Sequence, residues 1–156
     1  MKKSLIAYFS CTGTTKNIAQ AIADEIGGQL YEIKPAQKYT ERDLDWTNKN
    51  SRSSLEMKEK SSRPGIVDDL TNLDEFEVVF VGFPIWWYTA PTIINTFLES
   101  YDFGGKLIVP FATSGGSGFG QTGQSLQQSA PKARFAPGKV LRSAAEAAVW
   151  AKSLDI

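Results

Sequence analysis

The sequence contains no histidine and only one cysteine, Cys11, among its 156 residues. Without histidine, the Ser-His-Asp and Cys-His arrangements of nucleophilic catalysis are excluded, and the commonest metal ligand is missing. A single cysteine excludes a disulfide within the chain and, with histidine absent, argues against a structural zinc site. We therefore expect no metal site and no side chain that acts as a nucleophile, and we expect a bound cofactor to carry any chemistry.

Net charge is also lacking, because 17 Lys and Arg residues balance 17 Asp and Glu residues. This balance indicates neither nucleic acid nor an anionic membrane as a partner. No hydrophobic run approaches the roughly 20 residues of a membrane span, and the N-terminus has the pattern of a strand instead of a signal peptide. The sequence predicts a cytoplasmic chain that folds as a single domain over residues 1–156.

What the sequence does contain is a regular alternation of apolar strands and amphipathic helices. Strand-like runs cover 4–9, 29–34, 77–82 and 106–112, with a fifth around 135–141. Several of these runs are apolar on both faces, as expected for a parallel sheet covered by helices. The alternation predicts a doubly wound α/β domain with a five-stranded parallel sheet.

Three irregular stretches, 10–15, 83–90 and 113–120, each follow a predicted strand directly. Because parallel strands end at the same edge of a sheet, we expect these stretches to converge at a ligand site. The first is a cluster of hydroxyl side chains around Gly13, placed between a strand and the N-terminus of a helix. Unsatisfied N–H groups and the positive end of the helix dipole favour a phosphate there. An ordinary capped turn is the alternative.

Residues 36–65 interrupt the alternation and are rich in charge and in Ser and Asn. Excursions of this length in a compact domain are usually functional or disordered. Trp46 and the run Ser51-Arg52-Ser53 could reach the edge of a ligand. The alternative is a surface insertion that a few apolar side chains hold in place.

The residues of the first stretch decide which phosphate ligand fits. Gly13 is its only glycine, so the three glycines of a dinucleotide-binding turn are missing, and the NTP-binding Gly-x4-Gly-Lys-[Ser/Thr] pattern occurs nowhere. A small tyrosine phosphatase would need the pattern Cys-x5-Arg, but counting from Cys11 the arginine position holds Asn17. A response-regulator receiver would need carboxylates at its strand ends, which this chain lacks. A neutral, hydroxyl-lined site for a monophosphate remains.

With these residues in place, the chain resembles the flavodoxin family, which binds FMN noncovalently. The family's phosphate loop, [Ser/Thr]-x-Thr-Gly-x-Thr, is matched by Ser10, Thr12, Gly13 and Thr15. The resemblance spans nearly the whole chain except 36–65 and implies a flavodoxin-like three-layer sandwich with strand order 2-1-3-4-5. It also implies FMN as cofactor and electron transfer with a redox protein partner as function. The cofactor-binding residues that it implies are Ser10, Cys11, Thr12, Gly13, Thr14, Thr15, Pro84, Ile85, Trp86, Trp87, Tyr88, Thr113, Ser114, Gly115, Gly116 and Phe119.

Aromatic and small residues have separate roles in this interpretation. Trp86, Trp87 and Tyr88 can stack on the flavin ring or shield it from water, although we expect one of the two tryptophans to pack in the core. The small residues 114–116 let backbone N–H groups approach the pyrimidine edge, and a flexible linker is the alternative for this loop. Cys11 is expected to be a spacer within the phosphate loop. A redox-sensitive thiol is the alternative, because a helix N-terminus can lower a cysteine pKa.

Two features depart from electron-carrying flavodoxins. Those proteins are typically strongly acidic, which steers them to basic partners, whereas this chain is neutral. They also commonly place a glycine beside flavin N5, where its peptide flips, and residues 85–88 contain none.

The stretch 83–91 also resembles a loop of NAD(P)H:quinone oxidoreductases, which are usually homodimers that complete the pocket across the interface. An FMN-dependent oxidoreductase, with NAD(P)H and a quinone-like acceptor as its partners, is therefore the second hypothesis. A flavin-binding regulatory or interaction module is the third.

Overall fold

The computed structural model describes residues 3–114, 118–119 and 122–156. A parallel sheet with the strand order β2-β1-β3-β4-β5 lies at its centre, which confirms the predicted doubly wound fold and its topology. The predicted fifth strand is broken into β5 and β6, which both pair with β4, because Pro137 between them has no N–H to donate to the ladder. The strands are β1 (Ser4–Tyr8), β2 (Gln29–Glu32), β3 (Val78–Pro84), β4 (Leu107–Thr113), β5 (Arg134–Phe135) and β6 (Lys139–Val140).

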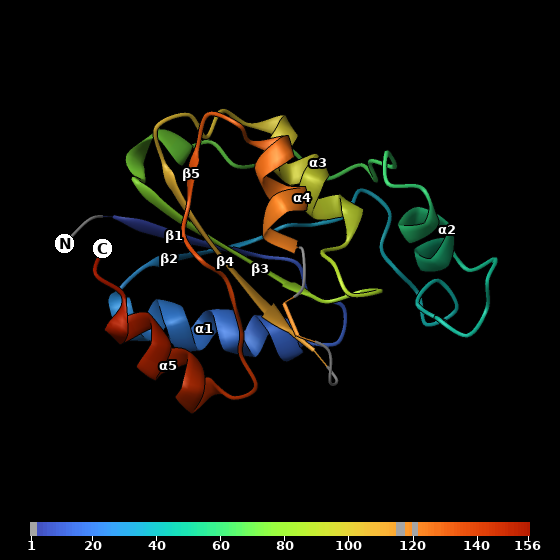
Figure 1. The fold of residues 1–156 in the computed structure, drawn as a ribbon, viewed down its shortest axis with the longest axis horizontal. Coiled ribbons are helices and arrows are strands. Elements are labelled where there is room, and N and C mark those ends of the chain that lie inside the picture. The colour runs from blue at the N-terminus through green and yellow to red at the C-terminus, as the bar shows by residue number, and fades with distance from the viewer. Residues whose placement is uncertain (1–2, 115–117, 120–121) are drawn as a thin grey trace.

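Two pairs of helices cover the two faces of the sheet (Figure 1). Helices α1 and α5 pack together on one face, and α3 and α4 pack together on the other. Alternate residues of β1 enter different apolar layers: Leu5 and Ala7 face one layer, Ile6 and Tyr8 the other. This explains why the strand is apolar on both faces. The helices are α1 (Thr14–Ile26), α3 (Thr92–Ser100), α4 (Thr122–Ser129) and α5 (Ala144–Ser153).

Residues 36–65 leave the body of the domain at the carboxyl edge of the sheet and carry α2 (Arg52–Lys58) (Figure 1). The base of this excursion is closed by backbone hydrogen bonds. The N–H of Ala36 donates to the carbonyl of Gly65 at 2.8 Å, and the N–H of Val67 donates to the carbonyl of Lys34 at 2.8 Å. A 3₁₀ turn, Leu73–Glu75, then leads into β3. The excursion is thus a closed loop with its own helix, and α2 lies beyond the carboxyl edge of the sheet (Figure 1).

The structure also bears on the question of membrane insertion. Among the residues that the structure describes, no helix has both the length and the apolar character needed to cross a bilayer.

Candidate cofactor site

A cavity of about 180 Å³ lies at the carboxyl edge of the sheet, where the loops after β1 and β3 meet the end of β4. The loops after β1 and β3 both reach this cavity, whereas from the stretch 113–120 the described lining residue is Thr113, at the end of β4. The excursion adds part of the wall, and none of the described residues that line the cavity carries a charge. The lining residues are Cys11, Thr12, Thr14, Thr15, Pro84, Trp86, Trp87 and Thr113 from the predicted loops, and Leu44, Trp46 and Ser53 from the excursion.

Ser10 shapes the turn between β1 and α1. Its Oγ accepts hydrogen bonds from the N–H of Gly13 at 3.1 Å and from the N–H of Lys16 at 3.3 Å. Gly13 has a φ of +91°, a left-handed conformation that glycine adopts without steric penalty, and α1 begins at the next residue. The N–H groups of Thr14 and Thr15, in the first turn of α1, have no carbonyl partner within the helix. These amides and the positive end of the helix dipole are suited to an anion.

The three threonines of this loop have different surroundings. Thr12 and Thr14 are exposed, and their Oγ1 atoms lie 3.4 Å apart. Thr15 is buried, and its Oγ1 lies 2.7 Å from Oγ1 of Thr113 at the end of β4. Thr12 and Thr14 therefore offer hydroxyl groups to a ligand, whereas Thr15 ties the loop to the neighbouring strand.

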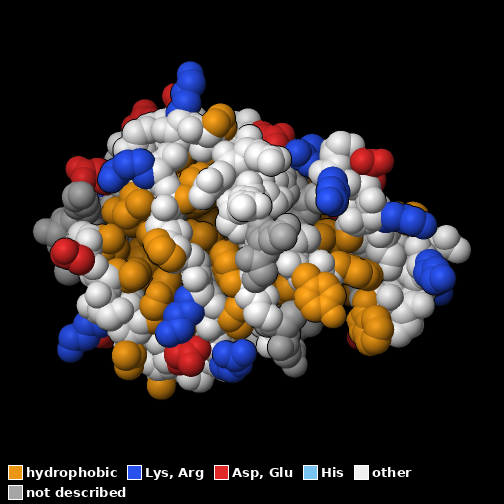
Figure 2. Space-filling model, in the orientation of Figure 1, with side chains coloured by type: hydrophobic (Ala, Val, Ile, Leu, Met, Phe, Trp, Pro, Cys, Tyr) orange, Lys and Arg blue, Asp and Glu red, His pale blue; other side chains and the backbone are white. Residues whose placement is uncertain are grey.

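In the loop after β3, one tryptophan packs against the core and the other is exposed. Trp86 is half-buried and packs edge-to-face against Phe9 and Tyr39, with ring centroids 5.8 and 5.6 Å away. Trp87 is 45% exposed and Tyr88 is 74% exposed. Trp86 is thus the tryptophan that packs against the core, although both tryptophans line the cavity. Hydrophobic side chains also reach the surface at the end of the molecule that carries α2 (Figure 2).

Ile85 and Ser114, two other described residues predicted in the loops after β3 and β4, are not among the residues that line the 180 Å³ cavity. Ile85 packs against the core, and its N–H donates to the carbonyl of Thr113 at 2.9 Å. Ser114 is half-buried directly after β4. Gly115 and Gly116 lie outside the described residues.

Two of the predicted aromatic residues, Phe119 and Tyr88, do not line the 180 Å³ cavity. Phe119 packs against Phe83, with ring centroids 6.4 Å apart. Tyr88 and Trp87 line a second, larger cavity of about 780 Å³, which extends along α3 and α4. Trp87 therefore takes part in both cavities.

Trp87 and Tyr88 form a tight turn in a strained conformation. Trp86 and Thr89 exchange two backbone hydrogen bonds, of 2.9 and 3.1 Å, and the residues between them have φ values of +47° and +67°. Positive φ at both central residues defines a type I′ turn, which usually holds Asn-Gly. A side chain in the left-handed region costs roughly 1–2 kcal/mol, and such strain is often found at functional sites.

We expect the variant Tyr88→Gly to be more stable than Tyr88→Ala by about 1 kcal/mol. Both changes remove the same exposed ring, and only glycine relieves the left-handed backbone. Urea unfolding of the two variants checks this result. At ordinary positions alanine is the more stable of the two, so a less stable glycine variant would contradict the strained turn.

Cys11 is not an activated thiol. Burial raises its pKa to about 11, and the nearby Arg52 opposes this shift only in part. The raised pKa argues against the alternative of a redox-sensitive thiolate, because it keeps the thiol protonated at neutral pH. Since the folded pKa is raised above the ordinary 9.0, the protonated thiol stabilises the fold below pH 9 and loses that effect as the pH rises through about 11.

Alkylation of Cys11 by iodoacetamide should accordingly be slow. A pKa of about 11 instead of 9.0 lowers the thiolate fraction at neutral pH about a hundredfold. Rates measured from pH 7 to 9.5 should keep rising without a plateau, in contrast to a small-molecule thiol measured in parallel. A plateau below pH 9 would contradict the assignment.

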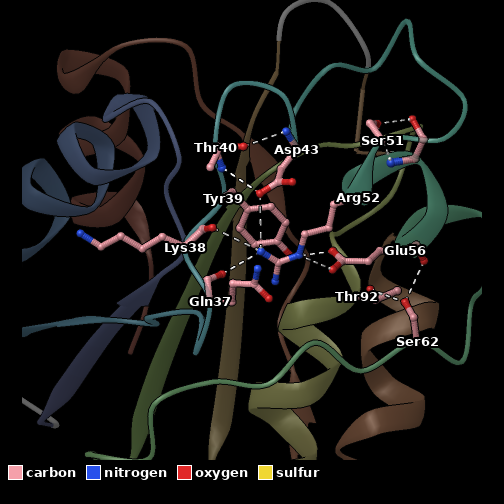
Figure 3. A network of polar contacts seen from close by, with 11 residues as sticks. Gln37, Lys38, Tyr39, Thr40, Asp43, Ser51, Arg52, Glu56, Ser62 and Thr92 are labelled. Atoms are coloured by element: carbon pink, nitrogen blue, oxygen red, sulfur yellow. Dashed lines mark hydrogen bonds and ion pairs between the residues drawn. The ribbon is translucent and has the colours of Figure 1, made fainter.

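Arg52 holds the excursion against the site (Figure 3). Its Nε donates to Oε2 of Glu56 at 2.9 Å, its Nη1 donates to the carbonyl of Gln37 at 2.7 Å, and its guanidinium carbon lies 3.8 Å from the centroid of the Tyr39 ring. The Tyr39 hydroxyl donates to Oε1 of Glu56 at 2.5 Å, and the Tyr39 ring contacts Trp86. Excursion and cavity wall are thereby one packed unit. The spacing of Arg52 and Glu56, four residues apart, was the available sequence signal for this network.

The doubly wound sheet, with a hydroxyl-lined cavity at its carboxyl edge, defines a flavodoxin-like protein. The Flavodoxin family profile matches residues 3–154, and the chain belongs to this family. No curated protein matches the sequence.

Solved structures resemble the chain over nearly its whole length. A candidate flavoprotein from Bacteroides eggerthii DSM 20697 is 45% identical to this chain, with a TM-score of 0.93. The match covers 100% of this chain and 99% of the Bacteroides eggerthii chain. One from Bacteroides uniformis ATCC 8492 is 47% identical, with a TM-score of 0.92, over 97% of this chain and 99% of its own. A flavoprotein from Lactobacillus acidophilus NCFM, crystallised in complex with FMN, shares the fold at 24% identity and a TM-score of 0.73, over 96% of this chain and 99% of its own.

Proposed function

We propose that the chain binds FMN noncovalently in the 180 Å³ cavity and transfers electrons through it. The observation that carries this proposal is the meeting, in one uncharged cavity, of the hydroxyl-rich turn at the start of α1 and the tryptophan pair after β3. Free first-turn amides and the hydroxyls of Thr12 and Thr14 suit a phosphate, and the indole rings suit a planar ligand. Membership of the Flavodoxin family supports the same ligand.

Bound FMN would supply one-electron and two-electron redox chemistry. The residues of this chain would bind it, orient it and set its surroundings. Neutral donors at the turn leave the negative charge of the phosphate uncancelled, and that charge opposes the addition of electrons to the ring. Trp86 and Trp87 would shield a bound ring from part of the water, which would penalise an anionic ring further. We therefore expect a low reduction potential.

The larger cavity favours a second candidate function, an FMN-dependent NAD(P)H oxidoreductase with a quinone-like acceptor. This cavity of about 780 Å³ shares Trp87 with the proposed cofactor site and is large enough for a second substrate. Lys60 and Arg63 line it and offer positive charge to the phosphates of a nicotinamide dinucleotide, although Arg63 also pairs with Glu99 at 2.9 Å.

Anaerobic mixing with NADPH distinguishes the two functions once flavin binding has been tested. Incubation with FMN should give a bound flavin absorption band and quench flavin fluorescence, and the absence of both would contradict the cofactor. With FMN bound, an electron carrier should stay yellow with NADPH until a separate reductase is added. Rapid bleaching by NADPH alone would reject the pure carrier and support the oxidoreductase.

A further inference from the structure

Ser53 lies in α2 and lines the 180 Å³ cavity. The residue is 2% exposed, and within the described part of the chain its Oγ is the one buried side-chain oxygen or nitrogen without a hydrogen-bond partner. A buried hydroxyl left unpaired costs about 1–3 kcal/mol, and native proteins retain few of them. An unpaired hydroxyl in the wall of a ligand cavity therefore indicates a missing partner.

The position of Ser53 is firmly held. Its backbone N–H donates to the carbonyl of Asp43 at 2.9 Å, and the preceding residue, Arg52, is bound to Glu56 and packed on Tyr39. Because the backbone is fixed in this way, the helix cannot easily turn the hydroxyl towards another acceptor. Rotation about χ1 is the single adjustment that a serine needs to reach a ligand within the cavity.

We propose that the Ser53 hydroxyl donates a hydrogen bond to the 5′-phosphate of FMN. The proposal rests on the proposed FMN function and adds a phosphate ligand from outside the loop at residues 10–15. The other hydroxyl groups that line the cavity with Ser53 are those of Thr12, Thr14 and Thr15 and that of Thr113, and the proposal places the phosphate among them. A phosphate offers more acceptor positions than the loop's donors fill, and a hydrogen bond to a charged oxygen is stronger than one to a neutral oxygen.

This contact gives the excursion a function. Residues 36–65 become a part of the cofactor site that closes over the phosphate, and the alternative of a surface insertion held by a few apolar side chains is set aside. The network of Arg52, Glu56 and Tyr39 then positions the helix that carries the phosphate ligand.

The test compares FMN with riboflavin, which lacks the phosphate. The variant Ser53→Ala should raise the Kd for FMN about 10- to 100-fold, as measured by quenching of flavin fluorescence. Its Kd for riboflavin should change less than about twofold, which also shows that the variant folds. Ser54→Ala is the matched control: it lies in the same helix, and its Oγ is already paired with Ser51 at 2.9 Å, so FMN binding should stay unchanged.

The outcomes separate the contact from the proposed function. If Ser53→Ala weakens FMN and riboflavin equally, or weakens neither, the phosphate contact is overturned while FMN binding stands. If the unaltered chain binds neither flavin, the proposed function itself fails and the contact fails with it. A loss for FMN alone supports the contact.

Discussion

Replacing Thr12 and Thr14 together with valine is expected to weaken FMN binding by about 3–6 kcal/mol, since each hydrogen bond to a charged phosphate oxygen contributes roughly 1.5–3 kcal/mol. Valine has nearly the shape of threonine, so the turn keeps its form and the phosphate meets methyl groups in place of hydroxyls. Both threonines are exposed, and their replacement should change the free energy of unfolding of the flavin-free chain by less than about 0.5 kcal/mol.

Titration of FMN and of riboflavin measures this effect. Riboflavin should bind the double variant almost as well as the unaltered chain, because the loss is confined to the phosphate. Thr71→Val, at another exposed threonine, serves as the matched control. Thr15 is a poor choice for the same experiment, because its replacement would leave the buried Thr113 hydroxyl without its partner. Unchanged FMN affinity in the double variant would place the phosphate elsewhere.

The second large effect is expected from Arg52→Met, which should destabilise the fold by about 2–4 kcal/mol, because breaking a largely buried ion pair leaves the Glu56 carboxylate without its cationic partner, with the Tyr39 hydroxyl as a neutral donor. The side chains of Arg52 and Glu56 are only 18% and 14% exposed. Methionine keeps most of the length of arginine but donates no hydrogen bond to Glu56 or to the carbonyl of Gln37. With α2 no longer held against Tyr39, FMN binding should weaken as well.

Urea unfolding and FMN titration check this expectation. Arg42→Met, at an exposed arginine of the same excursion, should change both quantities little. Arg52→Lys should restore little of the loss, because lysine lacks the planar fork that reaches a carboxylate and a carbonyl at once and stacks on a ring. An Arg52→Met variant as stable as the unaltered chain would show that the network does not hold the excursion.

The Tyr39 hydroxyl should remain a donor in this network throughout. Burial first, and the hydrogen bond to Glu56 second, raise the pKa of Tyr39 well above its ordinary value. The folded state therefore favours the neutral phenol, and this contribution to stability is present below pH 10 and lost only at higher pH.

The features that the sequence alone predicted are those that local patterns determine. Apolar periodicity defines the strands and helices, and the order of hydroxyls around Gly13 defines the turn, because each depends on residues near in the chain. The meeting of the ends of β1, β3 and β4 at one edge follows from the parallel sheet alone. The break between β5 and β6 could be located at Pro137 with hindsight, because proline cannot take part in a ladder.

The rest depends on contacts between distant residues. The residues next to Trp86 and Trp87 in the sequence do not indicate which tryptophan packs against the core. Trp86 does so because it contacts Phe9 and Tyr39, which are distant in the sequence. Ser53 likewise lies far in sequence from the loop at 10–15, and only the folded excursion brings the two to one cavity. The pKa of Cys11 is raised first by burial, which depends on the folded surroundings of the residue and not on its neighbours in the sequence.

The turn at Trp87 and Tyr88 restricts how its central peptide can rotate. Half a rotation would convert the type I′ turn into a type II′ turn, whose first residue has φ of about +60° and ψ of about −120°. Glycine dominates that position, and residue 87 is tryptophan. The potential of a bound flavin depends on the ratio of the affinities for its oxidised and reduced forms. A turn that cannot flip presents the same backbone groups to both forms, so the exchange of hydrogen-bond partners that a peptide flip provides would not contribute to the potential of a flavin bound beside it.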